Sequence, residues 1–134
     1  MKQVYPIVLT KDTDGYLVYI PDFDVNTEGC SMAEAIYMAR DAIGLMGIDY
    51  QDDGKALPVP TDMRSIEATV PDGSTVTLVD VDFDEYRRKH DSRAVRKNLT
   101  IPSWLNEEAE SAGINFSAVL QEALKNELHI WSKP

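Results

Sequence analysis

Three polar side chains near the C-terminal end have a spacing that suits the reading of DNA. Arg96, Asn98 and Thr100 fall on one face of an extended segment, because successive side chains of a strand point to opposite faces. Arginine can form two hydrogen bonds with guanine, and asparagine can pair in the same bidentate way with adenine. The opposite face carries Lys97, Leu99 and Ile101. The segment is therefore predicted to bury one face and to present the other to DNA.

The residues around this segment predict one short strand followed by two helices. Residues 95–101 form the expected strand, Pro102 ends it, and residues 113–115 make a turn between the helices. A lone strand with two short helices buries too little apolar surface to be stable alone. Two copies could pair their strands and pack their helices, and such a two-stranded ribbon fits the major groove. We therefore expect an obligate dimer through residues 95–128. Its core would contain Leu99, Ile101, Leu105, Val119, Leu120, Leu124 and Leu128.

Residues 95–128 resemble the ribbon-helix-helix DNA-binding domain of the Arc/MetJ type. The likeness lies in the alternating strand, Leu99-Thr100-Ile101-Pro102, Gly113-Ile114-Asn115 and the apolar second helix with Ala123-Leu124. In that family the outward strand residues read base edges, and the start of the second helix holds a phosphate. The free N–H groups and the dipole of a helix N-terminus favour that role. Lys97 takes a position where the family usually has an apolar residue. Its aliphatic stem can lie along apolar surface while its charged end reaches water. The DNA-binding residues implied by the resemblance are Arg96, Asn98, Thr100, Asn115, Phe116 and Ser117. The alternative is an ordinary helical hairpin behind a strand.

Charge is divided unevenly along the 134 residues, whose formal net charge is −10. Residues 1–86 hold 5 Lys+Arg and 17 Asp+Glu, whereas residues 87–134 hold 8 Lys+Arg and 6 Asp+Glu. An acidic body joined to a basic stretch indicates two modules with different partners. We expect a first domain at 1–86, a basic linker at 87–94 and a second domain at 95–134. The alternative is that the acidic surface only keeps the protein in solution.

Several classes of protein are disfavoured by the composition. Cys30 is the single cysteine, so no disulfide can form within the chain. No apolar run has the character of a signal peptide or the length of a membrane span, and a cytoplasmic protein is expected. His90 and His129 are isolated. Because no Cys/His spacing indicates a metal site, neither a metal nor another cofactor is expected.

The N-terminal half predicts an α+β fold, a small layer with a helix over a sheet. Ser31 and Glu34 fit a capping box at the start of a helix with an apolar stripe that reaches Met46. Residues 52–65 are expected to be a loop, and residues 83–90 a short helix. The apolar patterns predict strands at 3–10, 16–20, 25–28, 66–70 and 75–81.

This order of elements resembles that of the HicB antitoxins. The likeness rests on Asp14-Gly15-Tyr16-Leu17-Val18-Tyr19-Ile20-Pro21-Asp22-Phe23 and on Gly29-Cys30-Ser31-Met32-Ala33-Glu34-Ala35. Asp24-Val25 departs from the Gly-Cys that many relatives have. The resemblance implies a partial ribonuclease-H-like domain that binds HicA, a small basic ribonuclease toxin. It also implies a C-terminal ribbon-helix-helix dimer that represses its own operon by binding operator DNA, as a dimer or a larger oligomer such as a tetramer.

Two other functions fit parts of the same pattern. A repressor with a small-molecule-sensing N-terminal domain would share the DNA-binding half and have no toxin. Ribonuclease H folds also hold two Mg²⁺ ions between carboxylates, so a metal-dependent nuclease is the third interpretation. Such a site needs carboxylates that converge from several elements, and the interior strand positions here are apolar, so no catalytic residue is predicted. The carboxylates offered to a basic partner are Asp12, Asp14, Asp22, Asp24, Glu28, Asp49, Asp52 and Asp53.

Overall fold

The chain forms two compact units in a computed structural model that describes residues 1–91 and 93–130. Unit 1 is Met1–His90 and unit 2 is Asp91–Pro134. Helix α3 (Phe83–His90) ends unit 1. Residues 87–90 of the predicted linker are therefore helical, because Phe83 anchors this helix in the core with no exposed surface. Residue 92 of that linker and residues 131–134 of the predicted second domain lie outside the described residues.

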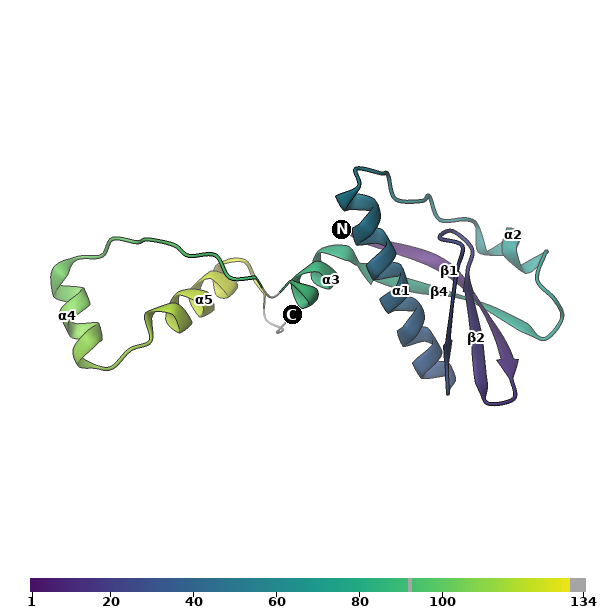
Figure 1. Cartoon of the computed structure of the whole chain (residues 1–134), viewed down its shortest axis with the longest axis horizontal. Coiled ribbons are helices and arrows are strands. Elements are labelled where there is room, and N and C mark those ends of the chain that lie inside the picture. Colours follow the sequence, from purple (N-terminus) through teal and green to yellow (C-terminus); the bar gives the residue numbers. More distant parts are fainter. Residues whose placement is uncertain (92, 131–134) are drawn as a thin grey trace. The chain divides into compact units, whose positions relative to one another are not determined.

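Unit 1 is an antiparallel sheet with a long helix on one face (Figure 1). The sheet order is β3-β2-β1-β4, so β1 pairs with both β2 and β4. This arrangement confirms the predicted α+β class. The bounds are β1 Lys2–Asp12, β2 Gly15–Ile20, β3 Val25–Gly29, α1 Met32–Asp52, α2 Met63–Glu67 and β4 Ser74–Asp82.

The core lies between α1 and the inner face of the sheet. Helix α1 starts where predicted, because the Ser31 side chain accepts a hydrogen bond from the Glu34 N–H at 3.1 Å. Ala35, Ala39 and Ile43 follow at helical spacing and have no exposed surface. They pack against buried strand residues, namely Tyr5, Ile7, Leu9, Val18, Ile20, Val79 and Val81.

The strand predicted at residues 66–70 is wrong. Residues 63–67 form helix α2, which begins after Asp62, whose side chain accepts a hydrogen bond from the Arg64 N–H at 3.3 Å. The N–H groups of Thr69 and Val70 both donate to the Ile66 carbonyl, at 3.0 and 3.2 Å. These donors close a local turn and leave no ladder bonds for a strand. The apolar residues of this stretch suggested a strand, but Ile66 is buried as part of a helix.

Two glycines of α1 allow α3 to pack closely against it. A Cβ atom placed on Gly44 would lie 2.4 Å from the Tyr86 ring, and one on Gly47 would lie 2.1 Å from the Phe83 ring. Real Cβ contacts are not this short, so only glycine fits at either position in this arrangement. The sequence pattern did not predict this contact, because glycine inside a helix usually indicates only a position that destabilises the helix.

Substituting Gly47 by alanine is expected to destabilise unit 1 by about 1–3 kcal/mol, the usual cost of overpacking a core. The better helix propensity of alanine would return only about 0.5–1 kcal/mol. Urea unfolding followed by circular dichroism measures the net effect. Adding Phe83→Leu should relieve part of the strain, which would appear as coupling in a double-mutant cycle. A more stable Gly47→Ala variant would contradict the close packing.

Unit 2 contains two short helices, α4 (Ser103–Ser111) and α5 (Phe116–Glu127). The predicted turn between them is present, with Gly113 at a φ of 68°, a conformation that favours glycine. No described helix is both long and apolar enough to cross a bilayer.

Candidate functional site

The predicted DNA-reading residues lie in an exposed segment of irregular backbone. Residues 93–102 form neither helix nor strand, and Arg96, Asn98 and Thr100 are all exposed. The predicted strand is thus absent from the single chain. A strand needs a neighbour to accept and donate its backbone hydrogen bonds, and we expected that neighbour to be a second copy. The role of these three side chains stays a prediction.

The predicted phosphate-binding residues lie at the start of α5. Asn115 is the N-cap, and its side chain accepts a hydrogen bond from the Ala118 N–H at 3.1 Å. Phe116 and Ser117 follow in the first turn and are exposed. N–H groups of a first helical turn have no partner within the helix, so this end can receive an anion. Phosphate binding here also stays a prediction.

Unit 2 has a large exposed apolar surface. In its described part, neither α4 nor α5 contains a fully buried residue. The exposed fractions of Leu99, Val119 and Leu128 are 66%, 56% and 67%. A stable monomer rarely leaves such a surface open to water. The other exposed apolar residues of this unit include Val95, Ile101, Trp104, Leu105, Ile114, Phe116 and Leu124.

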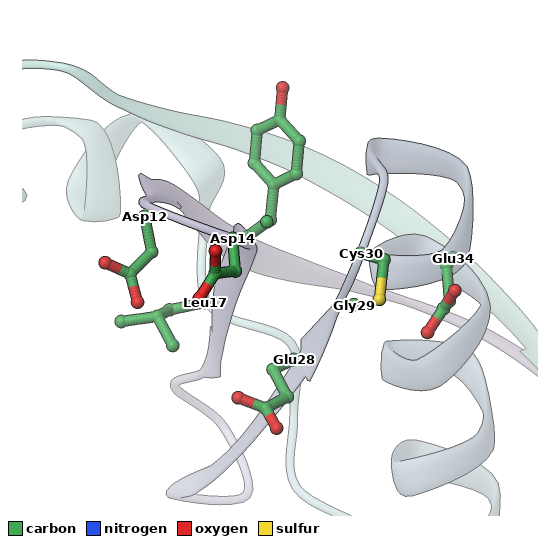
Figure 2. A pocket seen from close by; sticks show the side chains of 9 residues that line it. Asp12, Asp14, Leu17, Glu28, Gly29, Cys30 and Glu34 are labelled. Carbon is green, nitrogen blue, oxygen red and sulfur yellow. The ribbon is translucent and has the colours of Figure 1, made fainter.

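Unit 1 has an acidic hollow at the end of the sheet where β2 begins (Figure 2). Its volume is about 320 Å³. Three of the carboxylates named from the sequence lie in it, and Glu34 joins them from the first turn of α1. Sequence reasoning missed Glu34, although its place just after β3 was a usable signal. The lining residues are Asp12, Asp14, Gly15, Tyr16, Leu17, Glu28, Gly29, Cys30 and Glu34.

Close glycine contacts bring the walls of this hollow together. A Cβ atom on Gly15 would lie 2.3 Å from the Gly29 carbonyl oxygen, and one on Gly29 would lie 2.4 Å from the Ala35 nitrogen. Backbone cannot move aside as a side chain can, so neither position tolerates a larger residue. The β1–β2 turn, the end of β3 and the start of α1 are thereby held against one another.

The other carboxylates named from the sequence have separate local roles. Asp22 accepts hydrogen bonds from the backbone N–H and the hydroxyl of Thr61, and Asp24 accepts one from the Tyr19 hydroxyl at 2.9 Å. Asp49, Asp52 and Asp53 lie at the end of α1. Among residues 1–91 and 93–130, no group of three or more His, Cys, Asp or Glu side chains could hold a metal ion.

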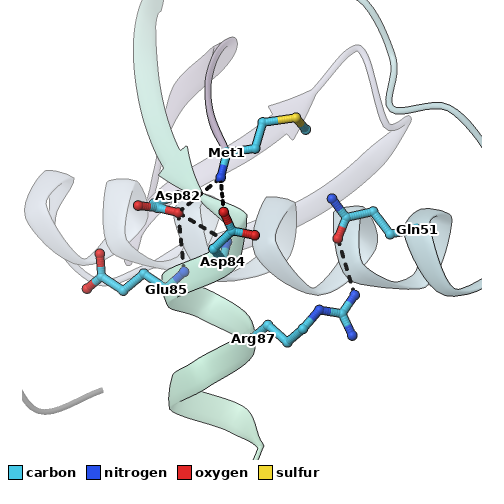
Figure 3. Close-up of polar contacts among 6 residues, drawn as sticks. All are labelled: Met1, Gln51, Asp82, Asp84, Glu85 and Arg87. Atoms are coloured by element: carbon cyan, nitrogen blue, oxygen red, sulfur yellow. Dashed lines mark hydrogen bonds and ion pairs between the residues drawn. The ribbon is translucent and has the colours of Figure 1, made fainter. Parts of the chain in front are cut away.

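The first turn of α3 carries a cluster of polar contacts (Figure 3). Asp82 accepts hydrogen bonds from the N–H groups of Asp84 and Glu85 and pairs with the Met1 ammonium group, which also contacts Asp84. Burial alone would raise the pKa of Asp82, but these N–H donors and the ammonium group lower it below its usual value.

Farther along α3, two side chains are tied to α1. Arg87 donates to Gln51 at 3.2 Å and to Asp52 at 3.0 Å. Arg87 falls in the predicted basic linker at 87–94, but its side chain is bonded within unit 1. Burial, with the nearby charge of Asp41 and its hydrogen bond, raises the pKa of Tyr86 to about 12.

The chain was compared with known families. The model of the family described as the HicB-like antitoxin of bacterial toxin-antitoxin systems matches residues 5–123. The chain belongs to this family. That family is one of antitoxins and not of enzymes, which confirms the prediction that the chain has no catalytic role. A protein described as an uncharacterized 14.9 kDa protein of Haemophilus phage HP1 is 31% identical over 104 residues, which cover 76% of this chain and 75% of that protein.

Solved HicB antitoxin structures share this fold. A toxin-antitoxin complex from Streptococcus pneumoniae contains a chain that is 29% identical, with a TM-score of 0.60 and coverage of 95% of this chain and 99% of that one. The antitoxin HicB of Burkholderia pseudomallei is 25% identical, with a TM-score of 0.54 over 91% of this chain and 96% of that one. A chain of the HicA3 and HicB3 complex is also 25% identical, with a TM-score of 0.50, and covers 60% of this chain and 99% of that one.

Proposed function

We propose that this antitoxin binds and neutralises a HicA-type ribonuclease toxin through unit 1 and represses its own operon through unit 2, in the cytoplasm. The likeness to a chain of a toxin-antitoxin complex over 95% of the sequence carries the toxin half of the proposal. Charge supports it, because residues 1–90 hold 17 Asp+Glu against 8 Lys+Arg. A ribonuclease that holds RNA presents a basic surface, and an acidic partner would meet it quickly through steering.

The operon half of the proposal rests on unit 2. Its exposed apolar side chains would form a shared core if two copies paired residues 95–101 as a ribbon and packed α4 and α5 together. The polar face of that ribbon would then carry Arg96, Asn98 and Thr100 into the major groove, while Asn115, Phe116 and Ser117 would hold a phosphate. Pairs of such dimers could join into tetramers.

Expression of fragments separates the two halves. The fragment 1–90 should restore growth to cells that express the toxin, because it contains the whole acidic unit, whereas 91–134 should not. The predicted boundary at residue 86 would cut α3 and lose the Arg87 contacts to α1. The full chain, expressed from its native operon, should copurify with a small basic protein. If none copurifies and 1–90 gives no rescue, a repressor with a small-molecule sensor becomes the better account.

A further inference from the structure

Strand β2 exposes two large apolar side chains on the face of the sheet that points away from α1. Leu17 is 47% exposed and Tyr19 is 38% exposed, whereas their neighbours Val18 and Ile20 are buried in the core. The pairing register places Leu17 between Thr10 of β1 and Glu28 of β3. Leu17 also lines the acidic hollow. A patch of exposed apolar side chains with polar residues at its rim is a feature of protein contact surfaces.

The carboxylates beside this strip differ from those near α3. Asp52, Asp80 and Asp82 are each paired with a cation, namely Arg87, Arg40 and the Met1 ammonium group. No ion pair joins any carboxylate of the hollow to a cation within residues 1–91 and 93–130; the nearby Lys11 lies over the Tyr16 ring, 5.1 Å from its centre. Four carboxylates that have no ion pair in the described residues are thus brought together around the start of β2. The hollow carboxylates are Asp12, Asp14, Glu28 and Glu34.

We propose that the β2 strip and the acidic hollow together form the surface on which a basic protein docks. This rests on the proposed function and specifies where on unit 1 the toxin binds. Arginine or lysine side chains of the partner would enter the hollow, whose volume of about 320 Å³ admits one or two long side chains. Apolar side chains of the partner would cover Leu17. A second copy of this chain fits poorly, because it would bring the same unpaired carboxylates against one another.

Charge reversal at the hollow tests this proposal. Asp14→Lys and Glu28→Lys change exposed positions and should each weaken binding of the copurifying basic protein by about tenfold or more, mainly through slower association. Asp53→Lys is the matched control. Asp53 is one of the carboxylates named from the sequence, but it lies outside the hollow, at the far end of α1, so the same charge change there should leave binding nearly unchanged. Surface plasmon resonance on the full-length variants gives both rates, and thermal unfolding confirms that each is folded.

Leu17→Ala tests the apolar half of the surface independently of charge. It should weaken binding at least about fivefold through faster dissociation, whereas Leu45→Ala, an exposed leucine of α1, should not. If the basic protein copurifies but the hollow and Leu17 variants bind it like the parent, this docking surface is wrong and the proposed function stands. If Leu17→Ala instead reduces self-association in sedimentation, a second copy occupies the strip and the proposal is overturned. If nothing copurifies, the proposed function itself fails.

Discussion

Replacing Leu120 and Leu124 of α5 by aspartate is expected to separate the proposed dimer into monomers and to reduce operator binding by more than about a hundredfold. The two side chains lie one helical turn apart on the same stripe. Leu124 is 52% exposed in the single chain, and the proposed dimer would bury it against the partner. A buried aspartate without a partner is costly enough to break such an interface. Operator binding then falls because the two half-sites are no longer bound by linked units.

The matched control adds the same two negative charges to the polar side of the helix. Gln121→Asp and Asn126→Asp together should leave the dimer intact, because both positions are exposed and outside the apolar set. Sedimentation equilibrium at micromolar concentration measures the oligomeric state, and a gel shift measures DNA binding. A parent chain that sediments as a well-folded monomer would refute the dimer.

The fold was predictable where a local pattern and the tertiary environment agreed. The expected helix at 83–90 coincides with α3. Helix α1 begins after Ser31, as the capping pattern in the sequence predicted. Strand β1 was recognised because Tyr5, Ile7 and Leu9 fall on one face at every second residue, and β2 because residues 16–20 form a continuous apolar run. The strand predicted at residues 66–70 was wrong because a short helix with one buried isoleucine can show the same apolar pattern as a strand.

The arrangement of the acidic residues could not be read in the same way. Asp12 and Asp14 were named among the carboxylates available to a basic partner, but nothing in their spacing indicated that Glu28 and Glu34 lie beside them. That proximity depends on the register of three strands and on two glycine contacts, which are tertiary facts. The pairing of Arg87 with Asp52 was missed for the same reason, since 35 residues separate them. A count of the basic residues in the sequence therefore overstates the positive charge that is available to contact DNA.

Arg96→Ala is expected to weaken operator binding by about 5- to 150-fold per half-site and to relax the preference at one base pair there. This range corresponds to the loss of a bidentate contact with guanine, worth about 1–3 kcal/mol. Asn98→Ala should act in the same way at an adenine. Arg96→Lys should recover affinity more than specificity, because lysine keeps the charge and lacks the planar fork.

Lys97→Ala is the matched control, because it removes the same charge from the neighbouring residue on the opposite face of the expected strand. Its loss should weaken binding alike for every sequence and leave the base preference unchanged, as expected for a cation that contributes only through the phosphate backbone. Gel shifts against a library of single-base operator variants, at two salt concentrations, distinguish the two effects. If Arg96→Ala and Lys97→Ala behave alike, the residues do not alternate between a DNA-reading face and a buried face, and the ribbon does not read the operator.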